Sequence, residues 1–328
     1  MRTLFPFSSQ LLTFVAFIIL TTTGLAGDPG EPFPLDGAVN GQKAGSILFY
    51  NIYTSSASSP AAENTLINIT NTSSSSSVIV HLFFVDGATC SPADFVLCMS
   101  PNLTFGFRAS ELDPGTSGYI MAVALNENGC PIIHNALIGD EYVRFVSGHA
   151  ANLQAEAVAA HRTPSCNDTS VMTNLNFNGI DYDRLPSVLA IDNIPSGADG
   201  YETMVILNRP SGDFALGADS IGSLSGLLYD DEERAFSFSL NANLCQFKFI
   251  FNNTTPRVVP RFMTVIPKGR SGWVRLFSYR NIPLLGAVIT FNPASSSSPS
   301  VFSGGHNLHK LKLTTSSISI PVFSSQCR

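Results

Sequence analysis

Leu112–Leu125 reads LDPGTSGYIMAVAL, a turn built on Pro and Gly that leads through Ser-Gly-Tyr into an apolar strand. Pro presets φ at the first turn position, and Gly accepts the positive φ that other residues resist. The chain repeats this pattern at Ile266–Phe277, which reads IPKGRSGWVRLF. In both copies a second Pro and another apolar run follow, at Cys130–Ile133 and Ile282–Leu285. We interpret the two stretches as one supersecondary unit that occurs twice.

The composition describes a folded protein with few charges. Hydrophobic residues make up 44% of the 328 residues, which is enough to build cores in about two domains. Charged residues are only 13%, against roughly 25% in an ordinary globular protein. The formal net charge is −6, and no run of Lys or Arg provides the clustered basic face that nucleic acid requires. We therefore expect no nucleic-acid partner.

The N-terminus is typical of a secretory signal peptide. Arg2 supplies a short positive region, Leu11–Leu20 form the apolar region, and Gly24–Ala26 offer small residues before a cleavage site. The apolar region is short for a membrane span, so a retained anchor is the less favoured alternative. We assign 1–26 to the signal peptide and 27–44 to a leader. We expect a secreted or cell-envelope protein with no stable membrane span after cleavage.

Six cysteines in an exported chain indicate disulfide bonds, with fifteen possible connectivities if all six pair. Their spacings fit no zinc template. The chain between Cys90 and Cys98 contains Pro92 and can fold back on itself, which predicts a local Cys90–Cys98 disulfide. The alternative pairs one of these two residues with Cys130. The six cysteines are Cys90, Cys98, Cys130, Cys166, Cys245 and Cys327.

Many short apolar segments bounded by Ser, Gly, Pro and Asn predict β-sandwich domains. Val78–Val85 is apolar on both faces, as a central strand would be. Phe236–Leu240 alternates, so Phe236, Phe238 and Leu240 should point into a core while the intervening serines face water. We expect an all-β protein with a first β-sandwich at 45–148 and a second at 186–293.

One segment departs from this pattern. Residues 150–161 read AANLQAEAVAAH and consist mainly of strong helix formers. We therefore expect a short connecting helix within a helix-and-linker region at 149–185. A Ser-rich linker and terminal strands should occupy 294–328.

The histidines do not indicate a metal site. His306 and His309 are separated by two residues, and the flanking sequence alternates with period two. On one strand these two side chains would point to opposite faces and could not bind the same ion, so we expect surface histidines. His81 lies within an apolar strand and is expected to be a hydrogen-bonded core residue. His134 and His149 have no visible carboxylate or thiol partner in the sequence.

Acidic clusters at Asp181–Asp183 and Asp230–Glu233 could bind Ca²⁺ on extracellular loops, but neither has the spacing of an EF-hand. We interpret the second cluster as a solvated hairpin tip.

Gly222–Gly226 lacks the central Ser of a nucleophile elbow. We assign no catalytic, cofactor-binding or metal-binding residue and expect no cofactor. Enzyme activity stays uncertain, with the balance against it.

Six N-x-S/T triplets are possible glycan acceptors: Asn68, Asn71, Asn102, Asn167, Asn252 and Asn253.

Several stretches in the first half resemble an uncharacterised family of secreted bacterial proteins that carry immunoglobulin-like β-sandwich repeats. The stretches are Asn64–Asn71, His81–Gly87, Asp113–Tyr119, Gly129–Pro131 and Ile138–Val143. The resemblance covers roughly the first half of the mature chain and implies that the sandwich there is immunoglobulin-like, while the second half rests on the internal repeat. With the helix and signal peptide predicted above, we expect two immunoglobulin-like β-sandwich domains joined by the short helix, after the signal peptide. It implies no known activity, and no functional residue is carried over.

Three functional hypotheses follow. The first is an exported, non-catalytic interaction module with an unknown protein or glycan partner at the cell surface. The second is a secreted hydrolase with its site between the two sandwiches. The third is a subunit that docks onto a surface assembly when its terminal strand adds to a sheet edge.

Overall fold

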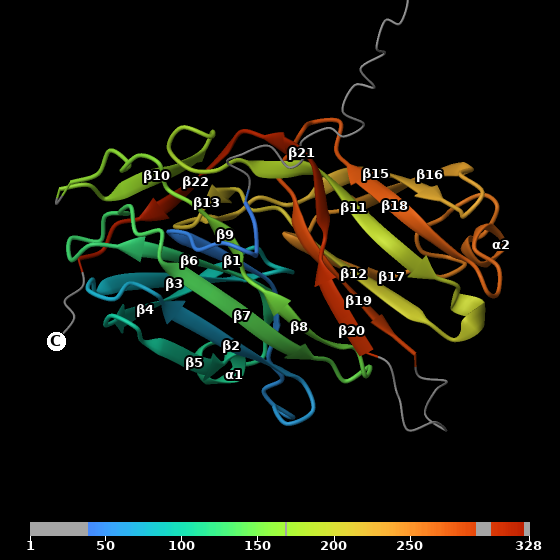
Figure 1. The fold of residues 1–328 in the computed structure, drawn as a ribbon, viewed down its shortest axis with the longest axis horizontal. Coiled ribbons are helices and arrows are strands. Elements are labelled where there is room, and N and C mark those ends of the chain that lie inside the picture. The colour runs from blue at the N-terminus through green and yellow to red at the C-terminus, as the bar shows by residue number, and fades with distance from the viewer. Residues whose placement is uncertain (1–38, 168, 293–302, 325–328) are drawn as a thin grey trace, which may run out of the picture. The chain divides into compact units, whose positions relative to one another are not determined.

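The computed structural model describes residues 39–167, 169–292 and 303–324, and this part of the chain is all-β (Figure 1). Its strands form five small sheets that belong to one compact unit. The expected signal peptide at 1–26 and the Ser-rich linker lie outside the described residues. Within the described ranges, no helix has the length and apolar character needed to cross a membrane.

The first half of the chain contributes nine strands. They are β1 (Ile47–Thr54), β2 (Asn64–Asn71), β3 (Val78–Asp86), β4 (Pro92–Met99), β5 (Thr104–Arg108), β6 (Ser117–Leu125), β7 (Leu137–Arg144), β8 (Ala150–Gln154) and β9 (Glu156–Val158). The described helices are single turns. They are α1 (Ala109–Leu112), α2 (Phe262–Val265) and a 3₁₀ turn at Gly197–Asp199.

The second half contributes the remaining strands. They are β10 (Met172–Phe177), β11 (Leu185–Pro195), β12 (Glu202–Asn208), β13 (Gly212–Asp213), β14 (Gly217–Ala218), β15 (Gly222–Tyr229), β16 (Ala235–Ala242), β17 (Gln246–Ile250), β18 (Ser271–Phe277), β19 (Leu285–Phe291), β20 (Ser303–Asn307), β21 (His309–Thr314) and β22 (Ser316–Pro321).

We name the five sheets by their strand order. Sheet A is β4-β3-β6-β1-β9, and sheet B is β5-β2-β7-β8. Sheet C is β16-β15-β18-β11-β21, and sheet D is β17-β12-β19-β20. Sheet E is β10-β22-β13-β14, in which β22 pairs antiparallel with β10 and parallel with β13.

The expectation of two immunoglobulin-like β-sandwich domains joined by a short helix is wrong. The described strands form five sheets in one compact unit, and no helix joins two domains within it. Strands β1, β3 and β6 of sheet A are buried on both faces, because sheet E covers the face that a two-layer sandwich would leave to solvent. Sheet E pairs β10 with β22 across more than a hundred residues of sequence, which local patterns could not reveal.

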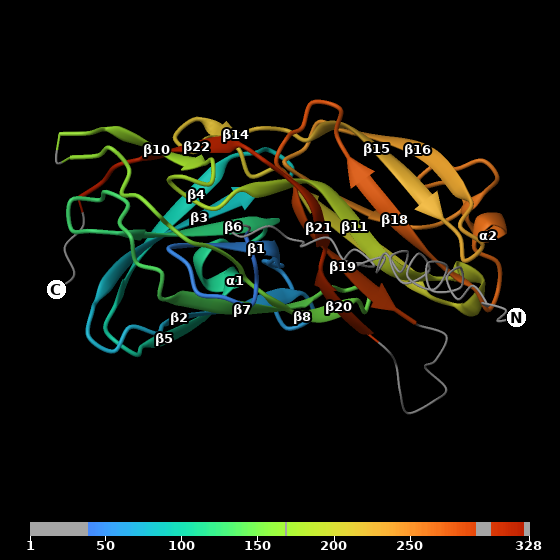
Figure 2. The same cartoon turned by 45° about the horizontal axis from the view of Figure 1, so that its top comes forward.

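The segment expected to be a helix forms β8 and β9 instead. Ala151 and Leu153 are buried while Asn152 and Gln154 are exposed, which is the period-two pattern of a strand. The high helix propensity of Ala and Glu is only a weak preference, and here tertiary packing overrides it. β8 lies beside β20 in Figures 1 and 2, so the segment connects the two halves through side-by-side strands.

The predicted equivalence of the two Pro/Gly turns is confirmed in strand order and register. β6 and β18 follow these turns, and they occupy the same position in sheets A and C. Tyr119 pairs with Val85 of β3, and Trp273 pairs with Tyr229 of the corresponding strand β15. β1 and β11 also match, because each has a register shift just before it pairs with the Ser-Gly step.

The Ser-Gly-aromatic pattern has a steric cause. A Cβ atom at Gly118 would overlap the carbonyl oxygen of Val85, and one at Gly272 would overlap that of Tyr229. Both positions therefore require Gly because the neighbouring backbone approaches closely. The motif that repeats in the sequence marks the same close contact in each half.

Each pair of facing sheets encloses an apolar core. Sheets A and B share a cluster that includes Tyr50, Ile67 and Phe84, and sheets C and D share one that includes Val205 and Val274. Two further clusters join other layers. One packs sheet A on sheet E, and the other joins β7 and β8 of sheet B to β12 and β19 of sheet D.

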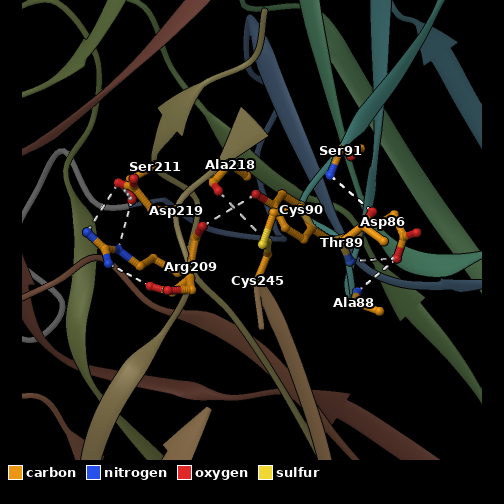
Figure 3. The surroundings of a disulfide bond; sticks show 12 residues. Asp86, Ala88, Thr89, Cys90, Ser91, Arg209, Ser211, Ala218, Asp219 and Cys245 are labelled. Atoms are coloured by element: carbon orange, nitrogen blue, oxygen red, sulfur yellow. Dashed lines mark hydrogen bonds and ion pairs between the residues drawn. A yellow bond between two sulfur atoms is a disulfide. The ribbon is translucent and has the colours of Figure 1, made fainter. Parts of the chain in front are cut away.

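A disulfide connects the two halves of the chain. Cys90, after β3, is bonded to Cys245, before β17, with 5.4 Å between the Cα atoms (Figure 3). The carbonyl oxygen of Gly87 accepts hydrogen bonds from the N–H groups of Cys245 (3.1 Å) and Gln246 (3.2 Å). The predicted Cys90–Cys98 bond and its Cys130 alternative are both wrong, because Cys90 is bonded to Cys245, 155 residues away, and Cys130 is bonded to Cys166. Cys98 is also disulfide-bonded.

A second disulfide joins Cys130 to Cys166, with 5.7 Å between the Cα atoms. It fixes the loop that follows β6 to the loop between β9 and β10. Both bonds have Cα separations in the usual range for disulfides. The general expectation of disulfide bonding is therefore confirmed, while the local pairing is not.

Buried polar side chains join the halves beside the Cys90–Cys245 bond. Asn208 donates from Nδ2 to the Asn51 carbonyl oxygen (2.8 Å), and Gln246 donates from Nε2 to Asn208 Oδ1 (2.8 Å). Asn51 Nδ2 donates to Asn307 Oδ1 (2.9 Å). Asn51, Asn208 and Gln246 are almost fully buried. Because these amides bond to one another across the junction, any shifted packing of the halves that kept them buried would leave them without partners.

We expect Phe238→Ala to destabilise the fold far more than Ser239→Ala. Phe238 is buried in the core between sheets C and D, and Ser239 faces solvent on the same strand. A buried Phe→Ala change costs about 3–5 kcal/mol, and a surface change about 0.5 kcal/mol or less. Urea titration of both variants measures the difference, and equal losses of unfolding free energy would show that the register of β16 is wrong.

Removing the Cys90–Cys245 bond should cost more stability than removing Cys130–Cys166. The two bonds close loops with sequence separations of 155 and 36 residues. The chain-entropy model gives a difference of about 1 kcal/mol in favour of the longer loop. Denaturant titrations of the Cys90→Ala/Cys245→Ala and Cys130→Ala/Cys166→Ala variants test this, after non-reducing peptide mapping confirms each pairing. A larger loss in the second variant would contradict the expectation.

Candidate functional site

The outer face of sheet C is the most distinctive surface of the described chain. The equivalent face of sheet A is covered by sheet E, so Tyr119 of β6 is only 1% exposed. On sheet C, the equivalent residue Trp273 is 38% exposed. The same structural position is therefore part of the core in one half and a surface in the other.

Trp273 forms an aromatic stack with Tyr229 on this face. The two residues lie opposite each other on β18 and β15. Their ring centroids are 4.2 Å apart, and the ring planes differ by 5°. Arg275 also points outward from β18 and lies opposite Leu227 of β15. On the other side of Leu227, Ser237 of β16 extends the same row. The face thus combines a fixed aromatic pair with a guanidinium group and neutral hydroxyls.

A charged hairpin tip borders the aromatic stack. The turn between β15 and β16 carries Asp230, which is buried and accepts hydrogen bonds from the backbone N–H groups of Glu232 (3.0 Å) and Arg234 (2.9 Å). Arg234 also pairs with Asp230 through Nε at 2.7 Å, and Arg270 pairs with Asp231. The expected acidic hairpin tip is confirmed, although Asp230 is buried rather than solvated. The carboxylates of Asp230, Asp231 and Glu232 already have cationic or backbone partners.

The other acidic cluster, at Asp181–Asp183, stabilises the chain near β10. Asp183 is fully buried and accepts hydrogen bonds from Lys43, from His161 Nε2 (2.9 Å) and from the N–H of Ala159 (2.6 Å). Asp181 accepts from the side-chain amides of Asn176 and Asn178. These bonds occupy the oxygens that an ion would need.

His306 and His309 meet at the edge of sheet C, contrary to expectation. The strand is interrupted at Leu308, so His306 belongs to β20 of sheet D and His309 to β21 of sheet C. Their ring centroids are 5.5 Å apart. Both Nε2 atoms approach Asp192 Oδ1, at 2.9 Å from His306 and 3.5 Å from His309. The prediction that the two rings point to opposite faces is wrong because it assumed one continuous strand.

The remaining histidines are structural. His81 is buried, and its Nε2 lies 2.8 Å from Asp94 Oδ2, which confirms the expected core histidine. Burial lowers the pKa of His81, while Asp94 acts in the opposite direction. His134 Nε2 lies 2.9 Å from Asn71 Oδ1, and His149 contacts Ser147 Oγ at 2.9 Å through Nδ1. Burial lowers the pKa of both of these histidines as well.

The possible glycan acceptors differ in accessibility. Asn71 is fully buried, and its amide donates to the Ser76 carbonyl oxygen at 2.8 Å, so it cannot carry a glycan in the folded protein. Asn102, Asn167 and Asn253 are exposed. Only the accessible acceptors are compatible with glycosylation of the folded chain.

Sequence reasoning found Trp273 as part of the repeat but did not identify its aromatic partner or Asp192. Tyr229 ends a strand whose pairing with β18 depends on the fold. Asp192 lies beside Asn193 in an otherwise mainly apolar strand, β11, without a motif around it. The only sequence signal for this face is the repeat, which has an aromatic residue at the same position in both copies, Tyr119 and Trp273.

Comparison with known proteins identifies no relative of this chain. No family model, curated protein or solved structure matches the chain. The resemblance to secreted bacterial proteins with immunoglobulin-like repeats therefore stays a prediction.

We expect the buried carboxylate of Glu141 to make stability fall as pH rises above about 4.5. Burial raises the pKa of Glu141 well above its usual value, although the N–H groups of Ile52 and Asn51 oppose this effect. The folded state therefore holds the proton more tightly than the unfolded state, so the stabilisation is complete at low pH and is lost as pH rises. The slope is at most about 1.4 kcal/mol per pH unit.

Glu141→Gln removes this charge and should flatten the dependence. Unfolding free energies measured between pH 5 and pH 8 should show the native chain losing stability relative to the variant as pH rises. Glu127→Gln, at an exposed turn position, is the control and should leave the slope unchanged. A parallel pH dependence in the native chain and in Glu141→Gln would contradict the assignment.

Proposed function

We propose that this chain is an exported, non-catalytic binding module and that the outer face of sheet C is its recognition surface. One observation carries the proposal. The repeat gives sheets A and C equivalent outer faces, and sheet E covers that of sheet A. On the outer face of sheet C, Trp273 is exposed and its stacking partner Tyr229 is half-buried. Exposed aromatic side chains beside Arg are characteristic of binding surfaces.

Export is supported by covalent chemistry. Two disulfides join described cysteines, and disulfides persist in oxidising compartments. The N-terminal signal pattern at 1–26 points the same way. We therefore place the protein outside the cytoplasm, as a secreted or cell-envelope component.

The chemistry of the face favours a glycan as the partner. An indole can pack against the C–H face of a sugar ring, because both surfaces are apolar and flat. Arg275 and the outward serines of β16 supply hydrogen-bond donors for hydroxyl groups around such a ring. The stack with Tyr229 holds the indole in place, which lowers the entropy lost on binding.

No described contact favours the other two hypotheses. Strand addition by the terminal strand would require a free edge, and β22 is already paired with β10 and β13. A hydrolase site between the halves has no support, because the buried amides of Asn51, Asn208 and Gln246 at the junction bond to one another.

We expect Trp273→Ala to weaken glycan binding at least about 10-fold, because truncating an aromatic anchor typically costs 2 kcal/mol or more. The purified exported protein is screened on a glycan array, and the best ligand is then titrated by calorimetry. Arg275→Ala should give a smaller loss. Tyr142→Ala is the matched control, because Tyr142 is an exposed aromatic residue on the outer face of sheet B.

Circular dichroism and thermal melting verify that each variant is folded. Equal affinity in the native protein and in Trp273→Ala would show that the recognition surface lies elsewhere. Failure of the native protein to bind any glycan on the array would contradict the glycan partner.

A further inference from the structure

We infer that Asp192, His306 and His309 form a binding site for Zn²⁺ or a similar divalent transition-metal ion. The site lies where the chain passes from sheet D to sheet C, and it is independent of what the outer face of sheet C binds. Within 39–167, 169–292 and 303–324, no other group of three His, Cys, Asp or Glu side chains brings its ligand atoms together in this way.

The backbone holds the two histidines in place. Leu308 lies between them and is 2% exposed, packed in the core between sheets C and D. Its N–H donates to the carbonyl oxygen of Gly286 at 2.9 Å. The buried Leu308 therefore fixes the point at which the chain changes sheets, and both neighbouring rings emerge on the same side of it.

Asp192 is brought to the same place by the irregular end of β11. The pairing of β11 with β18 shifts between Ile191 and Ile194, and Asn193 has a φ of +39°. This bulge leaves the Asp192 side chain 57% exposed and directed at both imidazoles. Bulges often re-aim a side chain in this way.

The ligand atoms are separated by distances that suit one ion. The three atoms lie within 4.8 Å of one another, and Asp192 Oδ1 is 2.9 Å and 3.5 Å from the two Nε2 atoms. Tetrahedral coordination with bonds of about 2.0–2.1 Å places neighbouring ligand atoms about 3.3 Å apart. Small rotations of exposed side chains bring the three atoms to that spacing.

The hydrogen bonding of His306 prepares its Nε2 as a ligand atom. Its Nδ1 donates to the carbonyl oxygen of Asn307 at 2.9 Å, which places a proton on Nδ1. In the neutral ring, Nε2 then presents a lone pair toward the Asp192 carboxylate. The Nε2 lone pair of the neutral ring and the Asp192 carboxylate oxygen are then both acceptors and repel each other. A cation bound between them removes this repulsion. Metal-bound histidines usually have this second hydrogen bond to a backbone carbonyl or carboxylate.

Two imidazoles and one carboxylate select the class of ion. Imidazole suits Zn²⁺, Cu²⁺ and Ni²⁺, whereas Ca²⁺ and Mg²⁺ prefer oxygen ligands alone. Three protein ligands leave a fourth position open. A cavity of about 480 Å³ adjoins the site and is lined by Asp192, His306, Tyr201 and Thr290 among others, so a small ligand could reach the ion.

The alternative is a surface ion pair in which a protonated His306 replaces the metal. Exposed pairs of this kind contribute little stability, and the side chains of His306 and His309 are 45% and 56% exposed. The two arrangements differ in one measurable respect. Only the metal site binds a stoichiometric ion through all three side chains at neutral pH.

The test uses the purified exported protein, prepared without a histidine tag and stripped with a chelator. Competition with a chromophoric chelator should show one tightly bound Zn²⁺ per chain. Addition of Co²⁺ should give visible absorption bands of nitrogen- and oxygen-ligated cobalt. His309→Ala and Asp192→Asn should each lower the Zn²⁺ affinity at least 10-fold and abolish these bands.

His161→Ala is the matched control, because His161 is also an exposed histidine beside an aspartate. It should retain native Zn²⁺ affinity. Circular dichroism verifies folding, which these exposed substitutions should preserve. The inference is overturned if the native chain binds Zn²⁺ no more tightly than His306→Ala/His309→Ala, or if His161→Ala lowers the affinity as much as His309→Ala. Glycan binding is measured separately, so failure of either proposal is distinguishable from failure of the other.

Discussion

The arrangement of this protein depends on a buried polar junction between its two halves. Asn51 enters that junction from β1, and its polar atoms bond to Asn208, Gln246 and Asn307 of the second half. Unpaired amides would cost free energy at this depth, so the contact specifies one relative placement of the sheets. The Cys90–Cys245 bond and the buried pair between Glu156 of β9 and Lys310 of β21 (2.6 Å) reinforce it.

The repeat explains why the same position has different roles in the two halves. Register makes Asn51 of β1 equivalent to Asp192 of β11, since each follows the last regular pair before the shift. In the first half this bulged position is buried and connects the halves. In the second half it is exposed and faces two histidines. One backbone irregularity therefore supplies both the structural junction and the inferred metal site.

Local features of this fold could be read from the sequence, and long-range ones could not. The Ser-Gly-aromatic step was visible because a steric requirement for Gly118 and Gly272 imposes it twice. Phe238 was placed correctly because strand alternation is local. The Cys90–Cys245 bond, the cover that sheet E forms and the meeting of His306 with Asp192 all depend on residues distant in sequence. The helix predicted at 150–161 is wrong because tertiary packing outweighs the helix propensity of these residues.

The order of strands along sheet E constrains when the first half can finish folding. β10 pairs with β22, and Asn174 meets Ser319 across 145 residues. The cover on the apolar face of sheet A therefore lacks Ile318 and Ile320 until β22 has been synthesised. Contacts this distant in sequence close slowly. The first half therefore completes its fold only after nearly the whole chain has been synthesised.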